Sequence, residues 1–337
     1  MKRFFIYVMS ILSVGMWSVA PLLAQVGMKK VGQSTMNFLQ VGVIPGACSM
    51  GEAYTAIGKG CESIFFNPAG LPEMDSKFAA IIATTNWFAD INYITGALAW
   101  NLGNFGTIGF SIVNVDYGDA IWTGLAESPD DEEGYVEYGM IDNVGAYAIG
   151  LSYGRRITNK FSIGGNARYV VQQLGESWLE SGKKKNSESN VSFDMGVKFY
   201  PGVKSFRFGM SMRNFGPSIK YEEITASLPL TFAVGCAMDM MDLIVPDHSQ
   251  DNSLLLSAEF IHPNNYTERV NIGLEYTLIK TLSLRCGYQT NTDLGGFSGG
   301  ICITPPSVGG TKLEFGYSYS VLDILDGVNR FSIKVAL

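Results

Sequence analysis

The residue types that most often perform catalysis are scarce in this chain and poorly placed to meet. His248 and His262 are its two histidines, and we expect them in a turn and at the far end of a strand, on opposite sides of the fold. Asp247, His248 and Ser249 form no triad, because side chains of adjacent residues point apart. No Cys-x-x-Cys or His-x-x-His pair has the spacing of metal ligands, and no phosphate loop joins a strand to a helix. We therefore expect no enzymatic activity, no metal site and no cofactor.

Charged side chains recur singly, at every second position of long stretches whose alternate positions are apolar. In residues 269–278, Val270 and Ile272 share one face while Arg269 and Glu275 share the other, which is the period of a β-strand. Inside a barrel such charges can pair across strands, either as a structural network around a plug or as a substrate site. The predicted lumen-facing charges are Arg168, Asp194, Lys198, Arg207, Arg213, Glu259, Glu275, Arg285 and Glu314.

The composition indicates that part of the surface faces something other than water. Of 337 residues, 47% are hydrophobic and only 16% are charged, whereas about 25% is usual in a soluble domain. No run of about 20 apolar residues follows residue 25, so helical membrane spans do not explain the composition. The net charge of −7 argues against a nucleic-acid partner. These properties together favour an all-β transmembrane barrel.

The alternating pattern predicts an antiparallel barrel of fourteen strands over residues 77–337. Several strands reach ten residues, the length of a tilted bilayer crossing, although a soluble β-sandwich stays open as an alternative. Long connections at 118–142, 175–189 and 215–228 follow odd-numbered strands, as extracellular loops do in outer-membrane barrels. The expected strands are 78–87, 91–101, 105–116, 143–154, 160–174, 190–200, 205–214, 229–240, 253–262, 269–279, 281–289, 296–304, 311–319 and 328–337.

Aromatic and acidic residues add two predictions about the ends of the barrel. We expect an acidic run, from Glu127 to Glu137 without a lysine or arginine, to be exposed and suited to a basic partner or a divalent cation. Large aromatic residues at strand ends are expected near the two membrane interfaces. These aromatic residues are Trp87, Trp100, Tyr117, Trp122, Tyr200, Tyr221 and Tyr319.

The segment before the first strand is rich in glycine and alanine and ends on the motif Asn67, Pro68, Ala69 and Gly70. Its small residues let a turn-rich chain pack closely, so we expect residues 25–76 to form a plug within the barrel. Asn67 can bond nearby backbone, and Pro68 fixes the turn that leads to the first strand. Whether the two plug cysteines at positions 48 and 61 form a disulfide stays open.

The N-terminus has the three regions of a secretory signal. Lys2 and Arg3 precede an uncharged run over residues 4–19, and we expect cleavage after Ala24. A retained membrane anchor is the alternative. With the signal at 1–24, the plug at 25–76 and the barrel at 77–337, the chain is expected in a bacterial outer membrane, in contact with its lipid.

Residues 38–71 resemble the opening of the PorV/PorQ family of outer-membrane proteins of Bacteroidetes, Gram-negative bacteria. This family is related to FadL-type barrels, and its plug carries an Asn-Pro-Ala motif. Glu52 and Lys59 depart from the family's plug, and Asn329 stands where a histidine is common. Further matches are FRFGMSMRNFGP (206–217), SLPLTFAVG (227–235), IGLEYTLIKTLSLRCGY (272–288), LEFGYSYS (313–320) and NRFSIKVAL (329–337).

The resemblance implies one of two functions. Some members of the family serve type IX secretion, which would make the chain a docking scaffold whose extracellular loops bind protein partners. FadL-type relatives instead admit hydrophobic small molecules past the plug, which would make it a transporter with a hydrophobic ligand. A continuous apolar tunnel or a lateral gap would favour the transporter.

Overall fold

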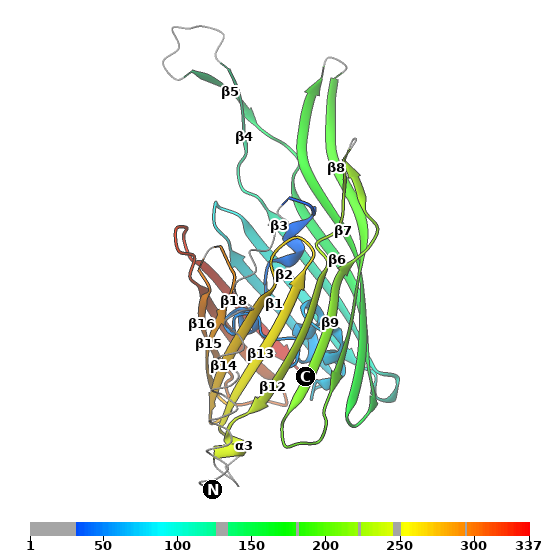
Figure 1. Cartoon of the computed structure of the whole chain (residues 1–337), viewed down its shortest axis with the longest axis vertical. Helices are drawn as coiled ribbons and strands as arrows, with labels where there is room; N and C mark the ends of the chain where they lie inside the picture. Colours follow the sequence, from blue (N-terminus) through cyan, green and yellow to red (C-terminus); the bar gives the residue numbers. More distant parts are fainter. Residues whose placement is uncertain (1–31, 126–133, 180–181, 222–223, 245–250, 294) are drawn as a thin grey trace.

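The computed structural model describes residues 32–125, 134–179, 182–221, 224–244, 251–293 and 295–337. Within these residues no helix is both long and apolar enough to cross a membrane. Strands dominate instead, and Figure 1 shows them as one tilted wall around a lumen. The predictions at residues 1–24, at His248 and over residues 126–133 of the acidic run lie outside the described residues.

Fourteen antiparallel strands close a barrel in the order β1-β18-β17-β16-β15-β14-β13-β12-β9-β8-β7-β6-β3-β2, which confirms the predicted fold class. Closure is direct, because β1 pairs with β18 along eight residue pairs. The barrel strands are β1 (Phe78–Asn86), β2 (Asn92–Asn101), β3 (Thr107–Asp116), β6 (Val144–Thr158), β7 (Phe161–Leu179), β8 (Gly182–Phe199), β9 (Arg207–Phe215), β12 (Thr231–Asp239), β13 (Ser253–Pro263), β14 (Arg269–Leu278), β15 (Leu282–Gln289), β16 (Phe297–Ile303), β17 (Lys312–Ser320) and β18 (Val328–Ala336).

The apolar face of each strand points outward, as the period of two requires. In β3 the burial alternates strictly, with Ile108, Phe110 and Ile112 exposed while Ser111 and Val113 are buried. Exposed isoleucine, leucine and phenylalanine side chains on this outer face are stable in a membrane because they contact lipid and not water. The buried face lines the lumen and contacts the plug.

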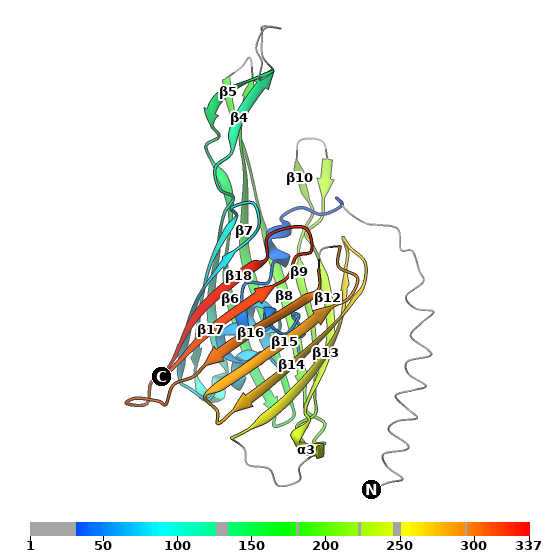
Figure 2. The ribbon, with the colours of Figure 1, turned by 90° about the vertical axis from the view of Figure 1, so that its left-hand side faces the viewer.

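The two ends of the barrel differ in height. At one end, called the upper mouth, β7 and β8 continue as a tall hairpin and two further hairpins rise, β4 (Ile121–Leu125) with β5 (Tyr135–Met140), and β10 (Ile219–Tyr221) with β11 (Ile224–Ala226) (Figure 2). The opposite end, the lower mouth, carries short turns and the short helix α3 (Met241–Ile244).

The prediction of a loop at 175–189 is wrong, because β7 and β8 stay paired as far as Leu179 and Gly182. Glu176 lies 3.7 Å from Lys183 and 3.9 Å from Lys185 across this hairpin. Both of its faces carry polar residues, so the alternation that marks a half-buried strand is missing from the sequence.

The interfacial position predicted for the aromatic residues is wrong for those that face the lumen and stays a prediction for the others. Trp100 and Tyr319 are exposed on the outer wall, and Trp122 packs on Tyr138 within the upper hairpin. The hydroxyl of Tyr200 bonds to the plug. Three others, Trp87, Tyr117 and Tyr221, pack against the buried core of the lumen. Trp87, Tyr117 and Tyr200 directly follow β1, β3 and β8 and continue the inward parity of those strands. Tyr221 lies within β10 and shares the parity of the buried Ile219.

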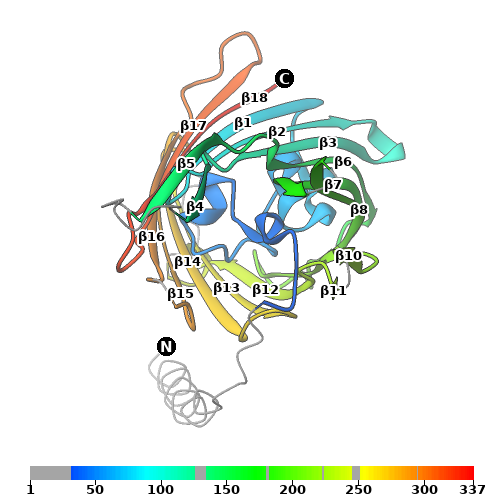
Figure 3. The same ribbon diagram turned by 90° about the horizontal axis from the view of Figure 1, so that it is seen from above.

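The plug runs through the lumen from the upper mouth to the lower mouth, and Figure 3 shows it inside the ring of strands. Thr35 donates its backbone N–H to Ser227 near the upper mouth, at 3.0 Å, and Lys77 donates to Leu337 at the lower one, at 2.8 Å. Between these points the plug forms only short turns of helix. They are η2 (Asn37–Gln40), α2 (Pro45–Cys48), η3 (Gly60–Phe65) and η4 (Pro68–Glu73).

Candidate functional site

The lumen gathers the buried polar and charged groups of this protein, and the Asn-Pro-Ala-Gly motif lies in it. Asn67 is fully buried, and its Oδ1 accepts a hydrogen bond from the N–H of Ala69 at 3.1 Å, which caps η4. Its Nδ2 donates to Thr55 O at 2.9 Å and to Val197 O of β8 at 3.0 Å. Pro68, Ala69 and Gly70 form the buried first turn of η4. One side chain thus fastens this turn both to the rest of the plug and to the wall.

Glycines of the wall let the plug backbone come this close. A Cβ added to Gly196 would lie 2.0 Å from Asn67 Oδ1, and one added to Gly164 would lie 2.3 Å from the backbone of Pro68. Higher in the barrel, a Cβ on Gly287 would lie 2.0 Å from the N of Gly51. Any larger residue would collide with the Asn67 side chain or with plug backbone, so glycine is required at these inward positions.

Near the lower mouth, buried charges join the wall to the plug. Lys198 of β8 has no exposed surface and lies 2.5 Å from Glu73 Oε2. The same ammonium donates to Gly58 O at 3.0 Å, and the Tyr200 hydroxyl donates to Glu73 at 2.8 Å. The ammonium keeps its charge inside the protein because a carboxylate and a carbonyl both face it.

A second group of charges lies on the opposite side of the lower lumen. Lys334 of β18 donates to Glu62 of the plug at 2.7 Å and to Glu314 of β17 at 3.0 Å. Arg285 of β15 pairs with Glu275 of β14 next to it in the wall. The ion pairs therefore link strand to strand as well as strand to plug.

All but one of the remaining predicted charges lie higher, on the β7, β8, β9 and β13 side. Arg168 pairs with Asp194 at 2.7 Å, where β8 and β9 shift register. Arg213 donates to Phe65 O at 3.1 Å. Glu259 accepts from the N–H and the Oγ1 of Thr55, both at 2.8 Å. Arg207 is half-buried at the lower end of β9 and joins none of these bonds among the described residues.

Several partners of these charges were not predicted from the sequence. Glu62 and Glu73 belong to the plug, where no strand period marks them, and each pairs with a wall lysine. Arg330 donates to Gly42 O at 2.8 Å. Arg330 and Lys334 both lie on the polar face of the last strand, where polar and apolar residues alternate. This period of two could have predicted from the sequence that both side chains face the lumen.

The plug cysteines are both free thiols. Cys48 and Cys61 are buried, and burial raises the pKa of each to about 12, so both stay protonated at neutral pH. A protonated, buried thiol is a small apolar side chain with little reactivity. The histidine within the described residues, His262, is exposed and lies 3.0 Å from Glu268.

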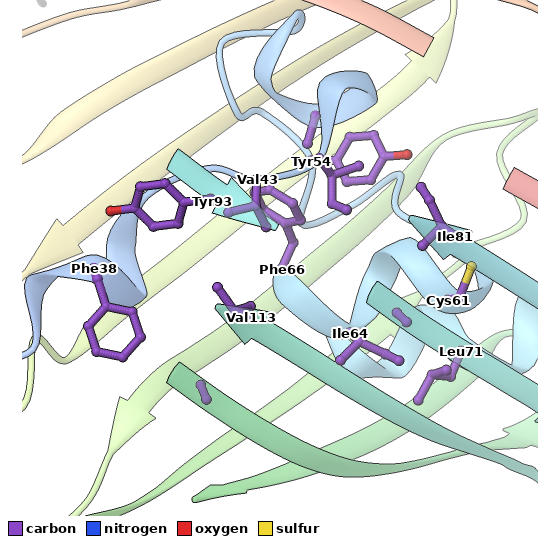
Figure 4. Packing of buried hydrophobic residues seen from close by; sticks show 14 of the residues in the cluster. Phe38, Val43, Tyr54, Cys61, Ile64, Phe66, Leu71, Ile81, Tyr93 and Val113 are labelled. Carbon is purple, nitrogen blue, oxygen red and sulfur yellow. The ribbon is translucent and has the colours of Figure 1, made fainter. Parts of the chain in front are cut away.

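Recesses lie at both ends of the plugged lumen, and a smaller cavity lined by Phe38, Val41 and Arg213 lies between plug and wall. The upper one, of about 480 Å³, lies between the start of the plug and the ends of β3, β7 and β10. The lower one, of about 210 Å³, lies between η4 and the strands β17 and β18. The upper and lower recesses share no lining residue, and a buried apolar cluster that includes Val43, Tyr54 and Phe66 lies in the plug between them (Figure 4).

Comparison with known families gives one match. Residues 130–325 match the family described as type IX secretion system membrane protein PorP/SprF. No curated protein matches the chain. The family match supports a type IX secretion protein of the outer membrane, but it does not confirm the narrower PorV/PorQ resemblance.

Solved structures that are similar to this chain include hydrocarbon channels. The CymD monoaromatic hydrocarbon channel is 12% identical with a TM-score of 0.54, covering 88% of this chain and 96% of its own. A Pseudomonas aeruginosa FadL homologue is 12% identical with a TM-score of 0.53, covering 88% and 98%. The P. putida toluene transporter TodX is 11% identical with a TM-score of 0.51, covering 88% and 96%. At these identities the likeness establishes the FadL-like barrel fold.

Proposed function

The chain belongs to the PorP/SprF family of type IX secretion system membrane proteins, and from this premise we propose that it is a non-enzymatic docking scaffold of the outer membrane. Its protein partners would be components or cargo of the secretion system. Because outer-membrane barrels keep their long loops outside, we assign the upper mouth to the cell surface and the lower mouth to the periplasm.

The observation that carries this proposal is the way in which the plug is fastened. Wall side chains from β8, β9, β13 and β18 bond to it, and Lys198 and Lys334 reach it with buried charges. Moving the plug aside would leave those charges unpaired, at a cost of about 3–5 kcal/mol for each buried pair. A plug held in this way favours a scaffold over a pore that opens in each transport cycle.

The β4–β5 hairpin is the best candidate for the docking surface. Leu125, Tyr135, Tyr138 and Met140 of the β4–β5 hairpin are exposed. A two-stranded hairpin is marginally stable alone, and its edges present unpaired backbone groups to a partner. The hairpin's apolar side chains would gain stability if a partner covered them.

The test is to replace residues 119–141 with a short glycine-serine linker in cells that lack the native gene. We expect secretion of type IX cargo to fall at least tenfold while the barrel reaches the outer membrane in normal amount. A matched variant shortens the β10–β11 hairpin instead and controls for general loop damage. Normal secretion by the variant that lacks residues 119–141, or an equal loss in both variants, would contradict docking through the β4–β5 hairpin.

A FadL-like channel for hydrophobic molecules is the second candidate, and the fold likeness to CymD and TodX favours it. It requires a path past the plug. The purified protein in lipid vesicles should then admit toluene faster than empty vesicles do. The scaffold proposal predicts equal rates, so a clear acceleration by the native protein would favour the channel.

A further inference from the structure

The recess at the upper mouth, called the aromatic recess, has no part in the docking function proposed above. Its volume of about 480 Å³ is within the range of small-molecule sites. It opens on the side that we assign to the cell surface. Its principal lining residues are Phe38, Trp87, Tyr93, Tyr117, Gln172 and Tyr221.

Contacts with Arg330 and with one another hold the aromatic rings of the recess in place. The guanidinium of Arg330 lies 5.6 Å from the centroid of the Trp87 ring and does not line the recess. Trp87 also meets Tyr93 edge to face, with ring centroids 6.4 Å apart. Figure 4 shows Tyr93 and Phe38 at one end of the buried cluster, away from Cys61 and Leu71. Because these contacts already order the rings, binding of a ligand would cost little side-chain conformational entropy.

Polar groups meet beside these rings. Gln172 Oε1 accepts from the N–H of Met36 at 3.2 Å and from the Tyr221 hydroxyl at 3.5 Å, and Tyr117 lines the same part of the recess. Thr35 Oγ1 donates to the Tyr221 hydroxyl at 3.0 Å. A hydroxyl has one donor and two acceptor sites, so the Tyr221 oxygen keeps one acceptor site for a ligand while it bonds to Thr35 and Gln172.

The charge of the lining excludes several classes of ligand. All twelve lining residues are uncharged. A phosphate or carboxylate would find no cation to pair with. A purely aliphatic molecule would cover the tyrosine hydroxyls and the amide without bonding to them, which is costly. The ligand that fits has an apolar face for the rings and neutral hydroxyls for the polar groups.

We infer that the aromatic recess binds a neutral saccharide of one to three sugar units. The C–H face of a pyranose ring would stack on Trp87 or Tyr93. Its hydroxyls would bond to Tyr117, Gln172 and Tyr221. The saccharide is either free in the medium or part of a polysaccharide on the bacterial surface, and both present the same chemistry to the recess.

The experiment titrates the purified full-length chain with maltotriose, cellotriose and the surface polysaccharide of the same bacterium, by calorimetry. The detergent must lack a sugar head group, because a maltoside would compete for the site. We expect saturable binding of at least one of the three probes. Binding of a trisaccharide assigns a free sugar, and binding of the polysaccharide alone assigns a surface glycan. Absence of binding to all three overturns the inference.

Tyr117→Phe and Tyr221→Phe separate saccharide binding from hydrophobic binding, because they remove the hydroxyls and keep the rings. Saccharide affinity should fall about tenfold in each variant, the loss of roughly one hydrogen bond. The matched control is Tyr319→Phe, on the exposed outer wall, which should bind normally. If toluene binds while no saccharide does, and both variants bind toluene as the native chain does, the recess is a hydrophobic site and the inference is wrong.

Discussion

Residues 34–40 and residues 42–74 both lie in the lumen, but the wall holds them by different chemistry. In the first stretch the hydrogen bonds that the structure describes join uncharged groups. Three of them come from the Asn265 side chain, which donates to Ser34, Asn37 and Gln40 at 2.7 to 3.2 Å. In the second stretch buried lysines and arginines reach the plug, as Lys198 does at Glu73.

The two kinds of attachment have different costs when they break. Water can replace a neutral bond at the mouth with little loss, since a typical hydrogen bond contributes about 0.5–1.5 kcal/mol net. A lysine that loses its partner in the lower lumen remains a buried, unpaired charge. Residues 42–74 therefore act as a permanent part of the barrel, and residues 34–40 are the part that can detach cheaply.

The largest effect is expected where the permanent part loses a buried charge. Lys198→Ala leaves Glu73 buried without its counter-ion, and the free energy of unfolding should fall by about 3–5 kcal/mol. Urea unfolding in lipid vesicles, followed by the gel mobility of the folded band, measures it.

The matched control for this variant is an exposed ion pair. Lys280 lies 3.0 Å from Asp251, and both side chains are more than half exposed. Lys280→Ala should cost no more than about 1 kcal/mol. If the two lysine variants unfold at the same urea concentration, the buried pair does not hold the plug.

A collision between wall and plug should have the next largest effect. Gly164→Ala would place a Cβ 2.3 Å from the backbone of Pro68, whereas Gly165→Ala would meet nothing closer than 3.6 Å. We expect about 3 kcal/mol of destabilisation from the first, because neither backbone can yield easily. The second should stay within about 0.5 kcal/mol of the native protein. Equal unfolding midpoints for the two variants would mean that the plug does not press against β7.

The Asn-Pro-Ala-Gly turn is attached by uncharged bonds although it lies in the permanent part. Asn67→Ala removes the cap of η4 and the bonds to Thr55 and Val197. We expect a loss of about 1–2 kcal/mol, the usual cost of losing a capping residue. Leakage of small solutes from proteoliposomes should rise with it. Native stability together with native permeability would reduce the motif to a linker.

The barrel could be predicted from the sequence because the strand period repeats in fourteen strands. Val191 to Phe199 alternates with Ser192, Asp194 and Lys198 in the sequence, and the burial of β8 follows the same alternation. The pattern is reliable because lipid on one side and a packed lumen on the other give each position one allowed polarity.

The features that could not be predicted are those in which no strand period applies. Above the membrane both faces of a hairpin meet water, so the residue types of the β7–β8 extension and of the β4–β5 hairpin do not alternate between apolar and polar as those of the wall do, and no residue of β4 or β5 is buried. In the plug no period applies, so the pairing of Glu62 with Lys334 was not predictable. The aromatic recess joins residues from five separate segments, and only the folded barrel brings them together.

The smallest effect is expected in residues 34–40, and it tests whether this stretch can detach without harming the barrel. Gln40 donates to Thr231 Oγ1 and to Asn265 Oδ1, both at 3.1 Å. Gln40→Ala should lower the free energy of unfolding by no more than about 1 kcal/mol, because water can satisfy the groups left behind. Hydrogen exchange of residues 34–40 should nevertheless accelerate severalfold, while exchange in residues 42–74 stays unchanged. If exchange rises along the whole plug, the two stretches open as one unit and the distinction between them fails.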